Sequence, residues 1–236
     1  TICRNEVKII QTPQLSLTNI LKKALDTKDE FTDDSSAVKN IGGTVFYTKG
    51  SNKSKKITFD DDLSDIKCLV SVSSDHFVGI GFDVHPFVKN RQMVLGGVKI
   101  DSSYGFEAHS DGDVLIHSLI DALLGASALG DIGEFFPDTN TKYKDISSVI
   151  LLDKVIKIIN SVGFEIINID ITIIAQIPKI NPYKQEIKSK LAKILNLPIF
   201  KINIKATTTE NLGFIGKKEG IAVQSIATLK FYDWTK

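Results

Sequence analysis

The 236-residue sequence has few of the features that mark several large protein classes. Its two cysteines, Cys3 and Cys68, have no metal-site spacing, and nothing in the sequence supports a disulfide between them. Lys and Arg almost balance Asp and Glu, and a net charge of +1 argues against a nucleic-acid-binding protein. No apolar run approaches the roughly 20 residues that a membrane-spanning helix needs. With 42% hydrophobic and 24% charged residues, the chain has the composition of an ordinary soluble protein with a buried core.

The chain is predicted to divide near residue 76. Residues 1–76 would form an N-terminal extension that is partly a flexible linker, and residues 77–236 would form the catalytic domain. Within the extension, residues 28–36 and 50–56 are rich in Asp, Ser, Lys and Asn, which is typical of solvated linkers. Apolar residues from Leu15 to Leu25 have the spacing of one short amphipathic helix.

Three of the four histidines, His85, His109 and His117, lie within one short window. Residues 79–85 are predicted to form a strand that ends at the following proline. Because alternate residues of a strand share a face, Asp83 and His85 would project together. Clustering of metal-binding side chains in a chain this poor in histidine indicates a site.

Residues 112–130 are predicted to form a helix, because apolar residues recur there at helical spacing. Ser110 or Asp111 would cap its start, and Gly130 would end it. His117 would lie about one turn inside this helix.

One carboxylate and two imidazoles make a three-ligand set that leaves the fourth position of a tetrahedral ion open, as catalytic zinc requires. We expect Asp83, His85 and His117 to form this set. Asp113 or Asp121, each four residues from His117 and on its helix face, would hold the second ring nitrogen of that imidazole.

The remainder of the chain mixes helices and strands. Helices are predicted over residues 147–161 and 182–195, and strands over 164–176, 202–208 and 220–231. This order favours an α+β fold, with helices packed on one face of a mixed sheet.

Six motifs then follow one another in a specific order: Gly81–His85, Ala108–Asp113, Asp121–Gly125, Leu129–Gly133, Phe136–Thr139 and Lys205–Glu210. Together they resemble the 2-C-methyl-D-erythritol 2,4-cyclodiphosphate synthase family of the non-mevalonate isoprenoid pathway, over about residues 78–229. The resemblance implies a homotrimer with active sites between neighbouring subunits. It also implies a lyase that converts 4-diphosphocytidyl-2-C-methyl-D-erythritol 2-phosphate to the 2,4-cyclodiphosphate and CMP by metal-assisted intramolecular phosphoryl transfer.

The resemblance assigns metal and catalytic roles. Zn²⁺ would bind to Asp83, His85 and His117, and Mg²⁺ or Mn²⁺ to Glu210 together with the substrate diphosphate. The catalytic residues that stabilise the transition state would be His109 and Thr208.

The same resemblance implies contacts with each part of the substrate. The zinc-binding strand would contribute Asp83, Val84 and His85, and the 2-phosphate would meet His109 and Ser110. The ribose would contact Asp131 and Gly133, and Ile132 between them would also contact the substrate. The erythritol pocket would contain Phe136, Pro137, Asp138, Thr139, Asn140 and Phe214. Cytosine would lie against Ala175, Gln176, Ile177, Pro178, Lys179, Ile180 and Asn181. The nucleotide phosphates would meet Thr208, and further contacts with the substrate would come from Thr207, Thr209, Glu210 and Lys217. Lys217 stands where many relatives have Arg, and Asn140 replaces an acid often found there.

Two other interpretations stay open at this point. A zinc-dependent phosphohydrolase acting on a nucleotide diphosphate would release inorganic phosphate instead of CMP and a cyclic product. An inert nucleotide-binding or structural module would bind no zinc, and the His117→Ala substitution would have no effect on turnover.

The sequence begins with Thr, which we interpret as the mark of a processed or truncated product. Residues 1–76 hold eleven basic and eleven acidic residues, whereas transit peptides are poor in acids. A Lys, Asn and Ile bias, with an extension before a bacterial-type body, favours a plastid-like organelle (apicoplast or chloroplast) of a eukaryote. The alternative is the cytoplasm of a bacterium.

Overall fold

The computed structural model describes residues 13–27, 29–51, 54, 56–59, 61–64, 73–108, 110–137, 139, 140, 143 and 146–233. Cys3 and Cys68 lie outside the described residues. The chain separates into two compact units, with the division near residue 70. Among the described residues, no helix combines the length and apolar character needed to cross a bilayer.

The N-terminal unit contains three short helices, α1 (Thr18–Leu25), α2 (Asp34–Asn40) and α3 (Asp61–Ser64). The predicted amphipathic helix is present as α1, whose buried Ala24 packs against residues of α2. The interpretation of residues 28–36 as linker is wrong at its end. There Asp33 accepts a hydrogen bond from the Ser36 backbone N–H over 2.7 Å and caps α2.

A five-stranded mixed sheet forms the centre of the second unit, in the order β4-β1-β7-β5-β6. Its strands are β1 (Phe77–Lys89), β4 (Tyr104–Phe106), β5 (Phe164–Ile174), β6 (Ile202–Thr207) and β7 (Gly220–Phe231). The β5–β6 pair is parallel and the other pairs are antiparallel. The sequence did not indicate β4, nor the hairpin of β2 (Met93–Leu95) and β3 (Val98–Ile100).

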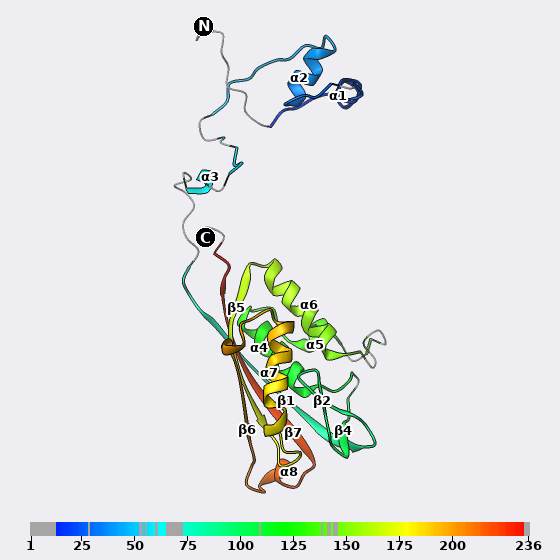
Figure 1. The fold of residues 1–236 in the computed structure, drawn as a ribbon, viewed down its shortest axis with the longest axis vertical. Coiled ribbons are helices and arrows are strands. Elements are labelled where there is room, and N and C mark those ends of the chain that lie inside the picture. The colour runs from blue at the N-terminus through cyan, green and yellow to red at the C-terminus, as the bar shows by residue number, and fades with distance from the viewer. Residues whose placement is uncertain are drawn as a thin grey trace. The chain divides into compact units, whose positions relative to one another are not determined.

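Helices cover one face of this sheet (Figure 1). They are α4 (Val114–Ala126), α5 (Ile132–Phe135), α6 (Ser148–Ser161) and α7 (Lys184–Ile194), whereas α8 (Gly213–Gly216) lies in the connection at the ends of β6 and β7, and single 3₁₀ turns occur at Asn181–Tyr183 and Ile199–Lys201. Helix α4 packs against β1 and β7, and α6 packs against α4 and β5. The predicted α+β class is therefore confirmed.

The sequence analysis expected the strand to end at Pro86, but β1 continues to Lys89. Pro86 is the last residue of β1 paired with β7, and from Phe87 the strand pairs with β4 instead. Because proline has no N–H to donate, it is tolerated here, where one ladder gives way to the other.

Helix α4 begins and ends inside its predicted limits. Asp113 is the residue that caps it, by accepting from the Ile116 N–H over 3.1 Å, and neither Ser110 nor Asp111 does so. The helix ends at Ala126, well before Gly130, because Ala128 has a left-handed backbone conformation (φ +56°).

Two glycines of β1 let α4 approach the sheet closely. A Cβ at Gly79 would lie 2.1 Å from the Ala122 carbonyl oxygen, and one at Gly81 would lie 1.9 Å from the Ser118 carbonyl oxygen. Only a residue without a side chain fits at either position. This contact brings the first turn of α4 beside the part of β1 that carries Asp83.

Candidate metal centre and substrate cleft

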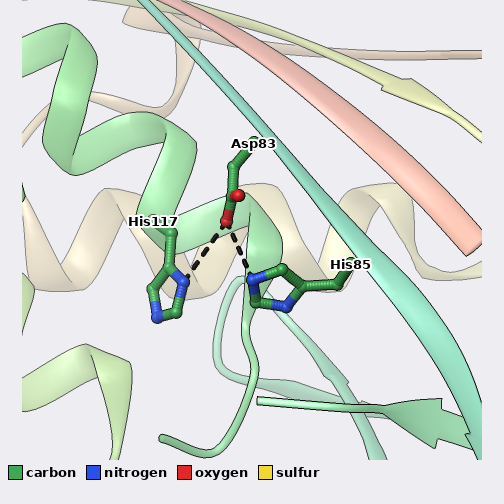
Figure 2. Close-up of side chains that lie close together, drawn as sticks. All are labelled: Asp83, His85 and His117. Atoms are coloured by element: carbon green, nitrogen blue, oxygen red, sulfur yellow. Dashed lines mark ion pairs between the residues drawn. The ribbon is translucent and has the colours of Figure 1, made fainter. Parts of the chain in front are cut away.

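The three side chains predicted to share an ion lie together. Asp83 Oδ2 is 3.0 Å from His85 Nε2 and 3.3 Å from His117 Nδ1, and the carboxylate points between the two rings (Figure 2). The three ligand atoms all lie within 4.8 Å of one another. A single cation can therefore reach all three.

Regular secondary structure holds each of these side chains. Asp83 and His85 alternate along β1 and so project from the same face, as predicted. His117 lies in the first turn of α4, where its backbone N–H donates to the Asp113 carbonyl over 3.0 Å. The site thus depends on how β1 and α4 pack rather than on loop conformation.

A hydrogen bond leaves the site-facing nitrogen of His85 free to act as a ligand. His85 Nδ1 lies 3.0 Å from the Gly112 carbonyl oxygen, which can only accept. Nδ1 must therefore carry the hydrogen, so the lone pair of Nε2 faces Asp83. This is the tautomer that a metal ligand requires.

The Asp83 carboxylate is only half satisfied by the protein. Its Oδ1 accepts the Val84 backbone N–H over 2.8 Å, whereas Oδ2 is buried without any well-formed hydrogen bond. A buried anionic oxygen is costly unless a positive group faces it. This unsatisfied oxygen, with two imidazole nitrogens turned toward it, fits a divalent cation.

The electrostatics of the site also favour positive charge. Burial acts to raise the pKa of Asp83, but the close His117 and His85 rings favour the charged carboxylate and hold that pKa well below its usual range. Burial acts to lower the pKa of His117, yet the Asp83 carboxylate raises it overall. A proton on His117 thus compensates the same negative charge, that of Asp83, that a bound cation would compensate.

The second ring nitrogen of His117 is not held by Asp113 or Asp121, so that expectation was wrong. Asp113 is fully buried and accepts from the backbone N–H groups of Gly96 over 2.9 Å and Gly97 over 2.7 Å. Asp121 accepts from Ile132 N–H over 2.8 Å, because it faces α5.

Two serine hydroxyls instead lie next to the second ring nitrogen of His117, Nε2. Ser148 Oγ lies 2.9 Å from His117 Nε2, and Ser110 Oγ lies 3.1 Å from it. Ser148 had no signal in the sequence, since it is 31 residues away and belongs to α6.

A cleft of about 570 Å³ opens beside the three ligands. Eight residues that the resemblance assigned to the site line it: Asp83, His85, Ser110, His117, Ile132, Gly133, Phe136 and Pro137. The sequence analysis did not place five further lining residues there: Glu107, Ala108, Asp121, Tyr143 and Leu151. Asp121 is the one with an earlier signal, as a helix neighbour of His117, and burial raises its pKa.

Four predicted residues near the cleft do not line it. Val84 projects from the opposite face of β1, and Asp131 caps α5 by accepting from the Glu134 N–H over 3.1 Å. Thr139 and Asn140 follow Pro137 and are exposed. His109 and Asp138 lie outside the described residues.

The other predicted site residues form a second group at the ends of β5 and β6. Their members are Ala175, Gln176, Ile177, Pro178, Lys179, Ile180, Asn181, Thr207, Thr208, Thr209, Glu210, Phe214 and Lys217, and none lines the cleft of the same chain. The Ala175 N–H donates to the Thr207 carbonyl over 2.9 Å, which joins the two loops. The Thr208 hydroxyl donates to Glu210 Oε1 over 2.8 Å, in a turn where Glu210 is left-handed (φ +51°). Within one chain, then, the predicted site is in two parts.

Comparison with known proteins decides the family. Residues 76–230 match the family model described as the YgbB family. The chain belongs to this family. The resemblance to cyclodiphosphate synthases is thereby confirmed, and solved structures described as such synthases share its fold.

The relatives of the chain include longer proteins. The "Bifunctional enzyme IspD/IspF" of Aliarcobacter butzleri is 59% identical over 236 residues, which cover all of this chain and 63% of the relative. A structure of the bifunctional IspDF from Campylobacter jejuni is 51% identical with a TM-score of 0.76, again over the whole chain and 63% of that protein. An IspF structure from Plasmodium falciparum, a CDP complex, is 33% identical with a TM-score of 0.60, and covers 68% of this chain and 99% of that one. The chain thus spans about 63% of the length of these bifunctional relatives.

The comparisons also bear on the N-terminal unit. Residues 1–71 match a second family model, 2-C-methyl-D-erythritol 4-phosphate cytidylyltransferase, which the sequence analysis did not foresee. The bifunctional relatives are bacterial, which fits the bacterial alternative and leaves the plastid-like interpretation without support. A Lys, Asn and Ile bias is a property of composition and does not specify a compartment.

Proposed function

We propose that residues 76–230 convert 4-diphosphocytidyl-2-C-methyl-D-erythritol 2-phosphate to 2-C-methyl-D-erythritol 2,4-cyclodiphosphate and CMP. The observation that carries the proposal is the convergence of Asp83, His85 and His117 on one point beside a cleft. Membership of the YgbB family supports the reaction, and the CDP complex of a relative supports a cytidine nucleotide as part of the ligand.

Zinc is the ion that best suits these three ligands. One carboxylate and two neutral imidazoles in a tetrahedral set leave one open position, which is the arrangement of catalytic zinc sites. When bound, the ion supplies Lewis acidity toward the diphosphate. Asp83 provides the negative charge that retains it, and the hydrogen bond from His85 to Gly112 keeps that ring in its ligand tautomer.

The reaction asks the protein mainly to position its substrate. An oxygen of the 2-phosphate would attack the β-phosphorus while the bond from that phosphorus to the CMP oxygen breaks, so both partners are already in one molecule. A phosphate oxygen is an anion and needs no side-chain base. Ser110, on the cleft wall, would donate to the 2-phosphate, while Ile132, Gly133 and Phe136 would exclude water around the ribose and erythritol.

Glu210 is the proposed ligand for Mg²⁺ or Mn²⁺ held jointly with the diphosphate. It is exposed, and a single carboxylate with phosphate oxygens is the usual manner of binding for Mg²⁺. Thr208, whose hydroxyl meets Glu210, would donate to the nucleotide phosphates in the complex. The loop of residues 175–181 would contact cytosine through its backbone groups.

The separation of the two groups supports a homotrimer with sites between subunits. The sheet face opposite the helices carries a row of exposed apolar side chains on β1, with Val78, Ile80 and Phe82 exposed by 62%, 63% and 58%. A single-domain surface rarely leaves such a row uncovered. In the trimer, the loops of one copy would complete the cleft of the next. Sedimentation equilibrium tests this directly, and a monomer at micromolar concentration would contradict it.

Product analysis tests the reaction. The full chain, loaded with Zn²⁺ and Mg²⁺, should release CMP in step with a cyclic diphosphate visible by ³¹P NMR. Inorganic phosphate in place of CMP would establish the phosphohydrolase instead. A preparation that binds no zinc and releases neither product would support the inert module.

The second family match extends the proposal to the whole protein. Since residues 1–71 match a cytidylyltransferase model and the named relatives are bifunctional, the whole protein would join this cyclase to a cytidylyltransferase. The test is release of pyrophosphate from CTP and 2-C-methyl-D-erythritol 4-phosphate by the full-length protein. Absence of that release, with the cyclase active, would remove this part alone.

A further inference from the structure

The hydrogen bonds of His117 continue to a carboxylate in another segment of the chain. Ser148, the first residue of α6, is fully buried, and its Oγ lies 2.9 Å from His117 Nε2. The same hydroxyl donates to Asp111 Oδ1 over 2.5 Å, and the Ser148 backbone N–H donates to Asp111 Oδ2 over 3.1 Å. We propose that Ser148 and Asp111 are positioning residues that hold the His117 ring in the tautomer and orientation that an ion requires. This inference rests on the metal centre of the proposed function.

The direction of each hydrogen bond follows from the carboxylate. An ionised carboxylate only accepts, so Ser148 must donate its one hydroxyl hydrogen to Asp111. Toward His117 the hydroxyl then offers a lone pair, so Nε2 donates its ring hydrogen to Ser148 when a cation lies between Nδ1 and Asp83. In a neutral imidazole the other nitrogen is the acceptor. That nitrogen is Nδ1, which faces Asp83 Oδ2 at 3.3 Å.

Asp111 is itself held in place. Its backbone N–H donates to the Ile146 carbonyl over 3.0 Å, and its Oδ1 lies 3.3 Å from the Asp113 backbone nitrogen, which donates to it. These contacts tie the start of α6 to the segment that precedes α4. The two histidine ligands are thus oriented by different means, His85 by a backbone carbonyl and His117 by a side-chain pair.

Ser110 gives His117 a second neighbour. Its Oγ lies 3.1 Å from His117 Nε2, and it also accepts the Gly112 N–H over 3.1 Å. When Ser148 loses its hydroxyl, this acceptor remains. We therefore expect a loss of zinc affinity at the lower end of the 10- to 100-fold range typical for partners of metal-bound imidazoles.

The test compares zinc affinity between variants of the full chain, by competition with a chromophoric chelator. Ser148→Ala should weaken zinc binding by about tenfold. Asp111→Asn should have a similar effect. Both Asp111 oxygens accept hydrogen bonds from Ser148, and the amide NH₂ of Asn can only donate, so one of these two hydrogen bonds would be lost or reversed. Ser147→Ala is the matched control. Ser147 is the N-cap of α6 and its side chain makes no capping hydrogen bond, so zinc affinity should stay within about twofold.

A second measurement separates positioning from general stability. In the zinc-free chain labelled with ¹⁵N-histidine, the two ring nitrogens of His117 report its tautomer at a pH where the ring is neutral. The chain has only four histidines, and His117→Ala identifies the signal. We expect the Ser148→Ala ring to carry its hydrogen on Nε2 less often than the wild-type ring does, because the Asp83 carboxylate attracts the hydrogen to Nδ1 and the Ser148 acceptor is lost.

The outcomes distinguish this inference from the proposed function. If the wild-type chain binds no zinc, the metal centre itself fails and this inference fails with it. If the wild-type chain binds zinc, and both variants match Ser147→Ala in affinity and keep the wild-type proportion of tautomers, only the role of Ser148 and Asp111 is overturned. Weaker zinc binding in both variants together with a changed tautomer supports it.

Discussion

The two groups of predicted site residues differ in how the fold holds them. The three proposed zinc ligands lie on β1 and α4, and their side chains are 26%, 12% and 15% exposed for Asp83, His85 and His117. The group around Glu210 lies on loops and turns at the ends of strands, and Thr208, Glu210 and Phe214 are exposed. The proposed ion-binding centre is thus complete within one chain, whereas the proposed nucleotide side would need another surface to enclose a ligand.

The strongest way to break this comparison is to remove the carboxylate of the centre. Asp83→Ala should abolish zinc binding and lower turnover by at least about 10³-fold, because several kcal/mol of transition-state stabilisation depend on the ion. Elemental analysis and CMP release measure the two effects.

The matched control for that change is Asp153→Ala. Asp153 is an exposed acid on α6 that pairs with Lys157, and such surface pairs contribute little. Zinc content and turnover should both stay at the wild-type level. Wild-type turnover in a verified zinc-free preparation would refute the assignment of the centre.

A change at Glu210, in the exposed group, should separate the effect of the proposed magnesium ligand from that of the proposed zinc ligands. Glu210→Gln keeps an oxygen for the Thr208 hydroxyl but removes the charge, so turnover should fall on the order of 10²-fold while the zinc content is unchanged. The measurement is turnover against Mg²⁺ concentration. An unaltered magnesium dependence would exclude Glu210 as the second metal ligand.

A third change acts on the scaffold that the buried centre depends on. Gly81→Ala places a Cβ against the Ser118 carbonyl and should lower the free energy of unfolding by about 1–3 kcal/mol or more, measured by urea denaturation. Gly125→Ala, on the facing side of α4, is the control. There the nearest atom is the Gly79 Cα at 4.0 Å, so the helix should gain up to about 1 kcal/mol. Equal destabilisation by both changes would mean that the close approach is not what holds the helix.

The smallest effect on turnover is expected from a change at Lys217, in the exposed group. Lys217 is the C-cap residue of α8, and Lys217→Arg supplies the guanidinium fork that the resemblance implies for this position, so KM should fall by no more than about threefold with kcat unchanged. Lys218→Arg alters the neighbouring residue in the same manner and should leave KM as it is. A drop in KM of equal size in both variants would show a general charge effect instead of a specific contact.

Much of the metal centre could be predicted from sequence because it depends on local periodicity. Alternation along a strand pairs Asp83 with His85, and helical spacing places His117 one turn inside α4. Bounds of the long elements were predicted on the same basis, and those of β7 agree at both ends.

The parts that could not be predicted depend on contacts between distant segments. The choice of Ser148 over Asp113 for His117 follows from how α6 packs, and no pattern within α4 contains that information. Short strands such as β4 carry too few residues to show a period. The second family match in residues 1–71 likewise had no local signal, because linker-like composition and a small helical pair can belong to either an extension or a domain.

The absence of side chains at Gly79 and Gly81 has a mechanical consequence. Because no side chain separates the β1 backbone from α4, we expect strand and helix to shift as one body and to carry the three proposed ligands with them. If a nucleotide binds as proposed, the opening that admits it would then come from the surrounding loops, and the spacing of the three proposed ligands would be kept.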